Sequence, residues 1–503
     1  MAASVESGLH PPLAEALERE GAGWAIERCA SFAAVLQGEP VEWGRLANEN
    51  PPQLRRDNVV EFHPAWHQLL GLSLDHGLHS LSWTEPREGA HVARAALFLL
   101  ASQVEAGHGC PISMTHAAVP ALRAAAPHLA AEWEPRLTAR TLCGMAMTER
   151  QGGSDVRTNT TAARPLGGDE YELYGEKWFC SAPMSDAFLV LAQAPGGLSC
   201  FLVPRGEGFH IVRLKDKLGD RSNASSELEL RGAWGRLVGE EGKGVRTIVE
   251  MVVHTRLDCV LGTAAGMRRA VEVATAHCAE RAAFGRPLIE QPLMQNVLAD
   301  LCVESEAATV TALRLARAYD RRAADEREAV FARIATAVAK YWICKRGPGH
   351  AAEALECLGG NGYVEESPLP RVYRQQPLQS IWEGSGNVVC LDVLRALRRE
   401  PRTAEVLLDE IGLAGEPRLS TAAERALAET GEGSARRLVE GLALALQGSL
   451  LVRHAPPAVA AAFIDSRLEG GNAAYGVLPT GADLGSIVER HGPRLTAGWN
   501  QRL

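Results

Sequence analysis

The chain is 503 residues long, which is too long for one ordinary hydrophobic core and predicts two to four domains or layers. Hydrophobic residues make up 46% of the sequence and charged residues 22%, as in globular proteins. The net charge of −9 excludes the uniformly basic surface of a protein that coats nucleic acid or an anionic membrane, although a local basic patch is compatible with it.

Residues 13–140 are rich in alanine and leucine and repeat with a helical period, as in GAHVARAALFLLASQVEAG at 89–107. Prolines at positions 51, 52, 64, 111 and 120 interrupt this pattern. We therefore expect several short helices, and we assign residues 1–140 to an N-terminal helical domain.

The pattern changes near residue 142. Five short runs of aliphatic, aromatic or alternating residues follow, separated by glycine and proline: YELYGEKWF, DAFLVLAQ, LSCFLVPR, FHIVRL and SELEL. Such runs predict a central antiparallel β barrel or sandwich, which we place at residues 141–236.

Long helical patterns return after position 244 and cover residues 245–284, 293–320 and 326–345. They are long enough for a helical bundle, which we assign to residues 237–400. Pro401 marks a further boundary, and residues 401–503 form an additional C-terminal helical domain with glycine-rich stretches near 470–482. The expected fold class is α+β and mostly α.

The eleven cysteines are scattered singly, without a C-x-x-C pair. Because many of them lie in apolar sequence, buried thiols of a reducing compartment fit better than a disulfide framework. The sequence shows neither a basic-then-apolar leader nor a run near the ~18 apolar residues of a membrane span. We therefore expect a cytoplasmic protein with no membrane partner.

The segment GMAMTERQGGSD at 144–155 combines two hydroxyls, two adjacent glycines, two acids and an arginine. One interpretation is a hairpin turn in which Gly152 and Gly153 adopt positive φ and Ser154 and Asp155 close the turn. The other is a cradle of backbone N–H groups and hydroxyls around a polar ligand, which only glycine lets approach. The segment by itself does not decide between them.

Four further motifs follow in order: KWFCSAP at 177–183, RAAFG at 281–285, LGGNGY at 358–363 and SIWEGSGN at 380–387. Together with the segment at 144–155 they resemble the acyl-CoA dehydrogenase family of flavoproteins. Longer stretches such as NPPQLRR, FHPAWH, MTERQGGSDVRTNTT and KDKLGDRSNAS resemble its AidB branch, which is linked to the bacterial adaptive response to DNA alkylation. The resemblance implies an FAD-dependent oxidoreductase, and it favours the cradle interpretation.

The resemblance also implies where FAD is held, namely between the β domain and the bundle. Thr148 and Ser154 would bond to the flavin ring or the pyrophosphate, and Phe179–Ser181 would pack on the isoalloxazine. Arg281 and Phe284 would reach the adenosine diphosphate half of a neighbouring subunit's FAD.

Two glycine-containing turns complete the implied site. The Gly359–Gly360 turn would let the backbone approach the cofactor, and Ile381–Asn387 would close the pocket, with Asn387 near the adenine. The implied cofactor-binding residues are Met145, Ala146, Met147, Thr148, Gly152, Gly153, Ser154, Phe179, Cys180, Ser181, Arg281, Phe284, Gly359, Gly360, Ile381, Trp382, Gly384, Ser385, Gly386 and Asn387.

The reaction that the resemblance implies needs a base. Removing hydrogens from Cα and Cβ of a thioester requires a base for the α-proton and a hydride acceptor, and no side chain accepts hydride. Glu383 is the carboxylate at the family's base position. A second base position of the family is Thr255 here, and threonine cannot serve. The alternative for Glu383 is an acid in the first turn of a helix, which the helix dipole favours.

The sequence departs from the family pattern at the acyl pocket. Members with ordinary substrates usually have YEGT where this chain has WEGS, so that the larger Trp382 would change the mouth of the pocket. The family's glutamine before the LGG turn is Glu356 here. We expect an acyl-CoA thioester as substrate, with a short branched chain as one candidate, an electron-transfer acceptor, and the family's homotetramer.

A second hypothesis is a flavoprotein that binds duplex DNA and protects or repairs alkylated bases, with weak or vestigial dehydrogenase activity. Duplex affinity comes largely from lysine and arginine on phosphates. Residues 401–503 hold ten arginines, no lysine and twelve acids, a net charge of −2. The arginines that could still form a local patch are Arg395, Arg398, Arg399, Arg436, Arg437 and Arg453. A solvated surface of mixed charge is the better interpretation for most of them.

Histidines provide no metal motif. His63 and His67 have i,i+4 spacing, and His76 and His79 lie nearby. A metal site needs a third ligand of consistent geometry, and neither an H-E-x-x-H motif nor a cysteine partner is present. We therefore expect structural or surface histidines and no metal.

Overall fold

The structure is a computed structural model that describes residues 8–468 and 474–492. The chain divides into two compact units. Unit 1 consists of Met1–Ala33, Glu88–Gln103 and Cys259–Leu503, and unit 2 of Ala34–Arg87 and Val104–Asp258. The described residues are mostly helical, with a seven-stranded sheet in unit 2, so the predicted fold class is confirmed.

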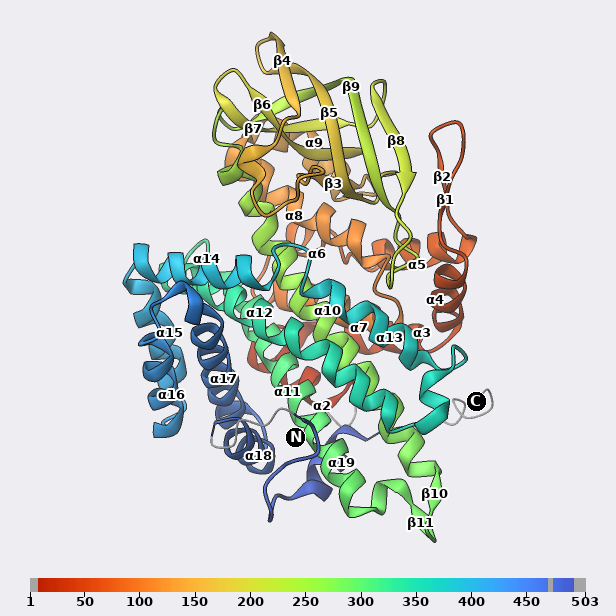
Figure 1. The fold of residues 1–503 in the computed structure, drawn as a ribbon, viewed down its shortest axis with the longest axis vertical. Helices are drawn as coiled ribbons and strands as arrows, with labels where there is room; N and C mark the ends of the chain where they lie inside the picture. The colour runs from red at the N-terminus through yellow and green to blue at the C-terminus, as the bar shows by residue number, and fades with distance from the viewer. Residues whose placement is uncertain (1–7, 469–473, 493–503) are drawn as a thin grey trace. The chain divides into compact units, whose positions relative to one another are not determined.

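Unit 2 combines short helices with the large sheet (Figure 1). Its helical elements are α4 (Glu39–Glu49), α5 (Pro64–Asp75), α6 (Leu81–Thr84), α8 (Gly109–Ala125), α9 (Pro127–Leu137) and the 3₁₀ turn η2 (Val156–Thr158). Its strands are β1 (Gln53–Leu54), β2 (Val60–Glu61), β3 (Cys143–Ala146), β4 (Ala162–Gly167), β5 (Glu170–Ser181), β6 (Ala187–Ala194), β7 (Gly197–Pro204), β8 (Phe209–Leu214) and β9 (Ser225–Val238).

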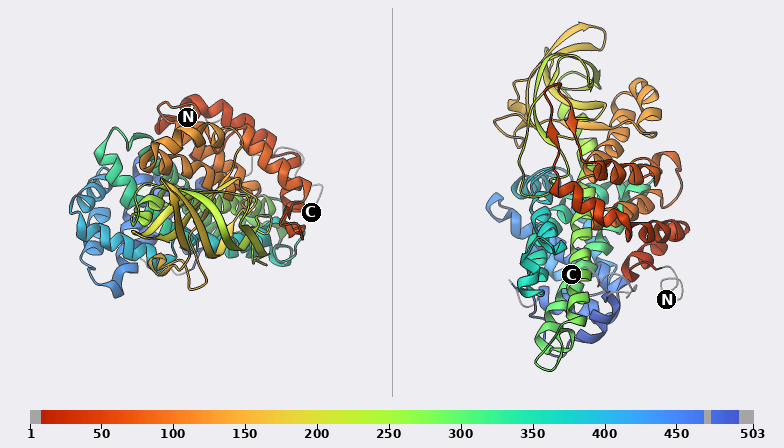
Figure 2. Two further views of the ribbon diagram at one scale, coloured as in Figure 1. Left: turned by 90° about the horizontal axis from the view of Figure 1, so that it is seen from above. Right: turned by 90° about the vertical axis from the view of Figure 1, so that its right-hand side faces the viewer.

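Strand pairing closes the sheet into a barrel. β4, β5, β9, β7 and β6 pair in that order, and β6 pairs again with β4. β3 is added to β6, and β8 is added to β9. Most pairs are antiparallel, whereas β3–β6 and β4–β6 are parallel. Figure 2 shows the twist of these strands. Of the two predicted alternatives, barrel and sandwich, the closed pairing matches the barrel.

The five apolar runs of the sequence are confirmed as strands β5 to β9. The sequence does not predict β3 and β4. β3 is only four residues long and contains glycine, and β4 carries Arg164 and Pro165 on a mostly exposed edge. Neither has the alternation or the β-branched content that indicates a strand, so tertiary pairing determines both.

The N-terminal helices are short, as predicted, but two of the prolines do not interrupt them. Pro111 and Pro120 both lie inside α8. Pro111 occupies the first turn, where a backbone N–H has no partner within the helix. Pro120 is tolerated because its neighbours Val119 and Ala121 are buried, and their packing holds the helix through the break.

Unit 1 is built almost entirely from helices (Figure 1). From α2 to α12 its elements are α2 (Pro11–Arg19), η1 (Gly23–Ala25), α3 (Ile26–Leu36), α7 (Ala90–Val104), α10 (Gly244–Glu280, which begins in unit 2), β10 (Ala282–Ala283), β11 (Arg286–Pro287), η3 (Leu288–Glu290), α11 (Pro292–Arg321) and α12 (Glu326–Glu356). The later elements are η4 (Gly359–Tyr363), α13 (Pro368–Gln379), α14 (Gly386–Arg399), α15 (Arg402–Gly412), α16 (Pro417–Leu427), η5 (Glu432–Ser434), α17 (Ala435–His454), α18 (Pro457–Arg467) and α19 (Leu484–His491). Part of the glycine-rich stretch predicted near 470–482 lies outside the described residues.

Helix α12 is longer than the sequence predicts. The helical pattern ends at Lys345, yet the helix continues through Pro348 to Glu356. His350 and Ala354, beyond the proline, are fully buried. Burial of this second half outweighs the lost hydrogen bond at the proline, and it places the LGG turn at the true end of the helix.

All eleven cysteines are buried and free, which confirms the prediction of buried thiols. Burial raises the pKa of thiols such as Cys29 and Cys143 to about 12. Such thiols stay protonated at neutral pH and are poor nucleophiles. Among the helices of the described residues, none is long and apolar enough to cross a membrane.

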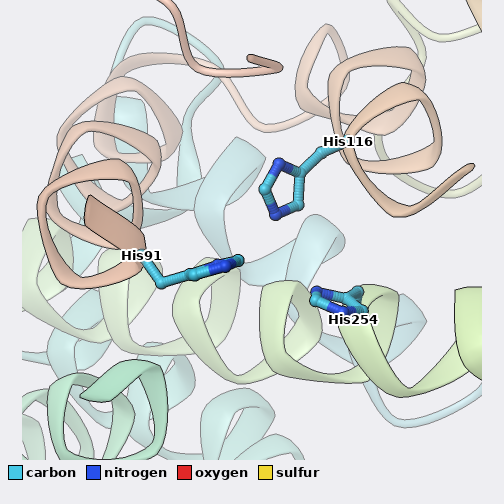
Figure 3. Close-up of side chains that lie close together, drawn as sticks. All are labelled: His91, His116 and His254. Atoms are coloured by element: carbon cyan, nitrogen blue, oxygen red, sulfur yellow. The ribbon is translucent and has the colours of Figure 1, made fainter. Parts of the chain in front are cut away.

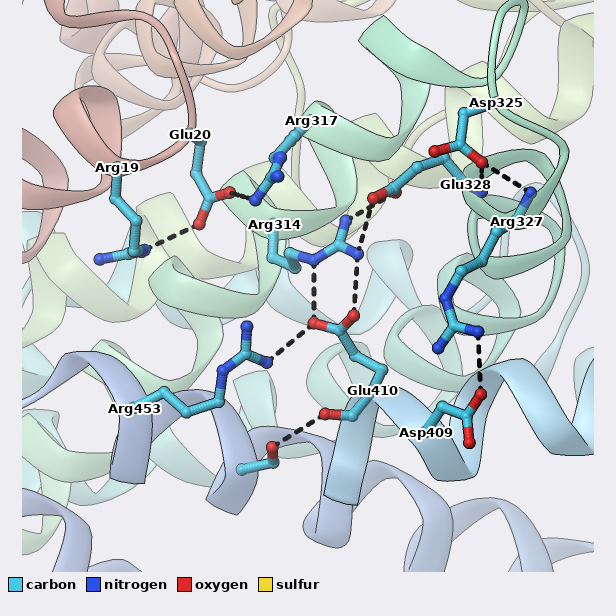
Figure 4. Close-up of polar contacts among 11 residues, drawn as sticks. Arg19, Glu20, Arg314, Arg317, Asp325, Arg327, Glu328, Asp409, Glu410 and Arg453 are labelled. Carbon is cyan, nitrogen blue, oxygen red and sulfur yellow. Dashed lines mark hydrogen bonds and ion pairs between the residues drawn. The ribbon is translucent and has the colours of Figure 1, made fainter. Parts of the chain in front are cut away.

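A buried network of ion pairs joins four helices of unit 1 (Figure 4). Arg314 of α11 donates to both carboxylate oxygens of Glu410 on α15, at 3.0 Å each, and to Glu328 on α12 at 2.9 and 3.1 Å. Arg453 of α17 also donates to Glu410, at 2.9 Å. Burial would raise the pKa of Glu410, but the two guanidinium groups outweigh it and hold the pKa at about 2. The network therefore ties α15 and α17 to the bundle.

Replacing Glu410 by glutamine should lower the free energy of unfolding by about 3 kcal/mol, because it leaves the buried Arg314 and the partly buried Arg453 without their shared carboxylate. The neighbouring Asp409 provides a matched control, since it pairs with Arg327 at 2.8 Å while both side chains are about half exposed. Asp409→Asn should cost about 1 kcal/mol or less. Urea denaturation of the two variants measures the difference, and equal costs would contradict a structural role for the network.

Candidate functional site

The loop that follows β3 in unit 2 contains a tight turn. Gly152 N donates to Glu149 O at 2.9 Å, and Gly152 has a φ of 113°, which favours glycine. Gly153 does not adopt the positive φ expected in the turn interpretation. A Cβ at Gly153 would instead lie 2.4 Å from Thr148 Oγ1. The absence of a side chain at Gly153 therefore lets the Thr148 hydroxyl lie against the backbone.

A buried ion pair holds this loop against β5. Lys177 Nζ lies 2.9 Å from Glu149 Oε1 and 2.7 Å from Leu191 O, and both charged side chains are almost fully buried. Thr160 and Thr161 donate further hydrogen bonds to the Glu149 carboxylate, at 2.7 to 3.1 Å. Burial would raise the pKa of Glu149, but Lys177 and these donors outweigh it and hold the pKa at about 2. The carboxylate therefore fixes the shape of the loop.

Two aromatic residues of β5 lie beside the loop. Trp178 N donates to Thr148 O at 2.9 Å. Lys215 Nζ lies 3.4 Å from the centroid of the Trp178 ring and 4.9 Å from that of Phe179, while the Arg150 guanidinium lies 4.7 Å from the Trp178 ring. Phe179 is 57% exposed. Cations thus hold the indole in place, and the neighbouring phenyl ring remains accessible.

These features of unit 2 fit a flavin. An isoalloxazine needs an aromatic surface for its face and hydrogen-bonding groups for its polar edge. Phe179 offers an exposed surface, and Thr148, whose backbone oxygen accepts from Trp178 N, adds a hydroxyl from the neighbouring loop. Cys180 is fully buried, and its Sγ lies 3.9 Å from Met145 O, so its side chain packs inward. Ser181 is half-buried, and its Oγ lies 3.4 Å from a second serine hydroxyl.

In unit 1, Glu383 occupies a strained turn between α13 and α14. Its φ is 58°, and Gly384 follows at 105°. A left-handed backbone costs a residue with a side chain about 1–2 kcal/mol, so glycine is usual at such positions. Helix α14 begins at Gly386, with Ser385 as its N-cap. Glu383 therefore lies before the helix, and the alternative of a first-turn acid is wrong.

Side chains from two helices hold the residues on either side of Glu383. Trp382 Nε1 donates to Gln379 Oε1 at 3.0 Å, and Lys340 Nζ of α12 donates to Gly384 O. Gln379 is buried against α10, where a Cβ at Gly262 would lie 3.1 Å from its Nε2. The turn is thus held before and after the glutamate.

The motif at 281–285 forms the tip of a short hairpin. β10 and β11 pair in antiparallel register, and Phe284 and Gly285 between them have φ of 53° and 85°. Positive φ at both central residues is the geometry of a tight two-residue hairpin. Phe284 is 98% exposed, and Arg281 is also exposed. The hairpin therefore presents a bare aromatic ring and a cation.

The LGG turn lies near this hairpin rather than near Glu383. Gly359, at φ 59°, and Gly360 are exposed at the end of α12. Cys278 Sγ lies 3.9 Å from Cys357 O, so the ends of α10 and α12 are side by side. Helix α13, of 12 residues and hence about 18 Å, separates this turn from Glu383. Within one chain the predicted unit 1 residues therefore form two groups.

The remaining residues of the SIWEGSGN motif surround the strained turn. Ile381 is 61% exposed. Asn387 is exposed on the first turn of α14, and its Oδ1 accepts from Arg436 Nε at 2.9 Å. A Cβ on Gly386 would lie 3.1 Å from Lys345 Cε, so this glycine lets α14 begin close to α12.

Three of the four histidines that the sequence singles out bond to backbone atoms, and the fourth, His67, meets the Trp66 ring edge to face at 5.1 Å. His63 accepts from an N–H in the first turn of α5 at 3.2 Å and so caps the helix. Ring nitrogens of His76 and His79 lie 2.9 Å from backbone carbonyl oxygens. These three side chains therefore have local structural roles.

Figure 3 draws three histidines that the sequence does not single out: His91 of α7 in unit 1, and His116 of α8 and His254 of α10 in unit 2. Within unit 2, the rings of His116 and His254 meet edge to face at 5.6 Å, and Trp83 stacks on His116 at 4.8 Å. Because they lie on separate helices, no spacing motif brings these two unit 2 residues together in the sequence.

Several arginines considered for a basic patch are bonded within unit 1. Arg453 is 19% exposed and pairs with the buried Glu410. Arg437 lies 3.5 Å from Glu429, and Arg398 donates to a backbone carbonyl at 2.7 Å. Arg453 is thus a structural residue of the ion-pair network.

Sequence reasoning missed three residues that shape the candidate site, namely Lys177, Trp178 and Lys340. Lys177 follows Glu176 in the alternating run YELYGEKWFC, whereas Lys340 interrupts the apolar run IATAVAKYWIC. A lysine at such a position must be buried or the run must be broken, and buried lysines have partners. That signal was available in the sequence, although it does not name the partner.

Three family descriptions match consecutive parts of the chain. The N-terminal domain of the adaptive response protein AidB matches residues 7–142, the acyl-CoA dehydrogenase middle domain residues 144–233, and the acyl-CoA dehydrogenase C-terminal domain residues 242–398. Together they span both units.

Curated and solved proteins agree with these matches. The chain is 47% identical over 491 residues to the AidB protein of Escherichia coli, covering 91% of each chain. The structure of Caenorhabditis elegans ACDH-11 in complex with C11-CoA has a TM-score of 0.82 at 27% identity and covers 96% of this chain and 90% of its own. A Bacillus anthracis acyl-CoA dehydrogenase complexed with FAD shares the fold, with a TM-score of 0.69 at 19% identity over 87% of this chain and 81% of its own.

Proposed function

Because the chain belongs to the AidB branch of the acyl-CoA dehydrogenase family, we propose that it oxidises the Cα–Cβ bond of an acyl-CoA thioester, with Glu383 as the base. The chain is an FAD-dependent oxidoreductase of this family. The observation that carries the proposal is the left-handed Glu383, because backbone strain of this kind is concentrated at functional sites.

The proposed step oxidises the thioester by two electrons. A carboxylate oxygen of Glu383 takes the proton from Cα, and the electron pair of that C–H bond forms the Cα=Cβ double bond. The chemistry that FAD supplies when bound is acceptance of the hydride that leaves Cβ. The half-buried Trp382 beside the carboxylate would exclude water, which favours proton transfer. The product is the corresponding enoyl-CoA.

The same chain offers residues for both ends of the cofactor. In unit 2, Thr148 and the exposed Phe179 would hold the isoalloxazine, and the Glu149–Lys177 pair would keep their loop in shape. In unit 1, Arg281 and Phe284 would reach the adenosine diphosphate half of the FAD of a second copy of this chain. That FAD lies between the β domain and the helical bundle stays a prediction, and so does the electron-transfer acceptor.

Acyl-CoA is the substrate class that the comparisons favour. ACDH-11 was solved with C11-CoA, and we transfer only the class, because Trp382 stands where ordinary members have tyrosine. Its indole is held by Gln379 at 3.0 Å, so we expect a larger and fixed side chain at the mouth of the acyl pocket. A panel of straight and branched acyl-CoAs, mixed anaerobically with the purified protein, tests the proposal. We expect bleaching of the flavin band with formation of enoyl-CoA. If no acyl-CoA of the panel reduces the flavin, the proposed activity is refuted.

We also propose that the exposed hairpin tip is an interface between copies of the chain. A ring that is 98% exposed on a strained turn is unfavourable in a monomer. Phe284→Ser should therefore lower the apparent mass in size-exclusion chromatography and weaken FAD binding about 10-fold or more. Leu166→Ser, which removes a 52% exposed side chain on β4, is the control and should change neither. A Phe284 variant with unchanged mass and FAD content would contradict this role.

Duplex DNA binding stays a prediction from the sequence. Titration of the protein against duplex DNA at two salt concentrations tests it, because phosphate contacts weaken steeply with salt. Absence of binding at low salt would remove this hypothesis. Since Arg453 pairs with a buried glutamate, Arg395 and Arg399 are better choices than Arg453 for charge-removing variants in such a titration.

A further inference from the structure

Lys340 of α12 is a fully buried lysine in an unusual environment. It is 1% exposed, and its Nζ donates to the backbone carbonyl of Gly384. Within the ranges that the structure describes, no carboxylate forms an ion pair with it. Burying an ammonium group beside a neutral carbonyl is costly compared with an apolar side chain of the same size. Stability alone therefore does not explain a lysine at this position.

The carbonyl that Lys340 binds belongs to the residue directly after Glu383. Without a constraint, a glutamate would leave the left-handed region, because that region costs it about 1–2 kcal/mol. On the other side of the glutamate, the Trp382 indole is held by Gln379 at 3.0 Å. Glu383 is therefore held at φ 58° between two fixed neighbours. The Lys340 ammonium group fixes the one that follows it, Gly384.

We propose that Lys340 is a positioning residue that holds the Glu383 turn through Gly384 O and so keeps the carboxylate at the Cα proton of the bound acyl-CoA. This inference rests on the proposed function of Glu383. It assigns Lys340 an effect on proton transfer, since a displacement of about 1 Å at a reacting group can cost about 100-fold in rate. It assigns no contact between Lys340 and the substrate.

The first test compares Lys340→Met with Lys345→Met. Lys345 lies five residues further along α12, is exposed, and also lies near this turn, with its Cε 3.1 Å from the place of a Cβ on Gly386. Lys340→Met should lower the limiting rate of flavin reduction about 100-fold at saturating acyl-CoA, with unchanged acyl-CoA affinity and FAD content. Lys345→Met removes a charge from the same region and should leave the rate unchanged.

Chemical rescue separates positioning from a general structural role. Lys340→Ala removes three carbons and the nitrogen, which propylammonium can replace. Added propylammonium should restore the rate of this variant in a saturable manner, whereas tetramethylammonium, which carries the charge but has no N–H to donate to Gly384 O, should not. Where Lys340→Met does not fold, Lys340→Arg and this amine dependence carry the test, and a rate that the amine does not change overturns the inference.

A structural readout is independent of activity. In a crystal structure of Lys340→Met, residue 383 should leave positive φ or its turn should be displaced. A variant that keeps φ near its value of 58° and reduces the flavin as fast as the wild type overturns the inference while leaving the base assignment intact. If instead no acyl-CoA reduces the wild-type flavin, the proposed function fails, and the φ of residue 383 still decides whether Lys340 holds the turn.

Discussion

Replacing Glu383 by glutamine is expected to slow flavin reduction by acyl-CoA about 100- to 10 000-fold, the range that general base catalysis contributes. Glutamine has nearly the same shape and cannot accept the α-proton. The variant should retain FAD and the same thermal stability, because the left-handed backbone at position 383 costs glutamine the same strain energy as glutamate. Stopped-flow measurement of the flavin band under anaerobic conditions gives the rate.

A matched control for this variant is Glu366→Gln. Glu366 is an exposed glutamate in the same unit, just before α13. The flavin of the Glu366→Gln variant should be reduced by acyl-CoA as fast as that of the wild type. A Glu383→Gln protein that bleaches at the wild-type rate would show that another group takes the proton.

Replacing Glu149 by glutamine is expected to lower the free energy of unfolding by about 3–5 kcal/mol, because it leaves Lys177 charged, buried and without its carboxylate. The loop that carries Thr148 should lose its shape, and FAD should be released more readily. Urea denaturation followed by tryptophan fluorescence, together with the FAD content after gel filtration, measures both effects.

The neighbouring pair provides the control for Glu149. Arg150 and Glu176 lie 3.0 Å apart, beside the buried pair in both sequence and space, and their side chains are 66% and 41% exposed. Glu176→Gln should therefore cost about 1 kcal/mol or less and leave FAD bound. A similar loss in both variants would show that the buried pair has no special role in the loop.

The buried pair also predicts an acid limit for the loop. The pKa of Glu149 is about 2 in the folded protein, below its ordinary value of 4.5. Because the folded pKa is depressed, the contribution of this group to stability is complete above pH 4.5 and is lost as the pH falls toward 2. Release of FAD should follow the same window in the wild type and be absent from the pH profile of Glu149→Gln.

Local sequence patterns determine the parts of the fold that were predicted correctly. Strands β5 to β9 follow from alternation and from glycine and proline at their ends. α12 exceeds its prediction because Pro348 is a local signal, whereas burial of the residues beyond it depends on tertiary packing. The sequence does not predict β4, because its pairing with β5 and not its composition makes it a strand.

For the candidate site, the sequence indicates residue types but not the contacts that fix them. Glu383 follows from the resemblance, but its left-handed φ and its place before α14 do not. Lys177 and Lys340 lie 28 and 44 residues from their partners. Pairings at such separations are set by the packing of whole elements, so no short motif encodes them.

In the proposed reaction, Glu383 removes the α-proton while a hydride leaves Cβ. The most direct test is anaerobic reduction of the wild-type protein by an acyl-CoA that carries deuterium at Cα, compared with the unlabelled thioester. We expect complete bleaching of the flavin band in the wild type, slower with the labelled thioester and nearly abolished in Glu383→Gln. A flavin that bleaches equally fast in the wild type and in Glu383→Gln, or that no acyl-CoA bleaches, would contradict it.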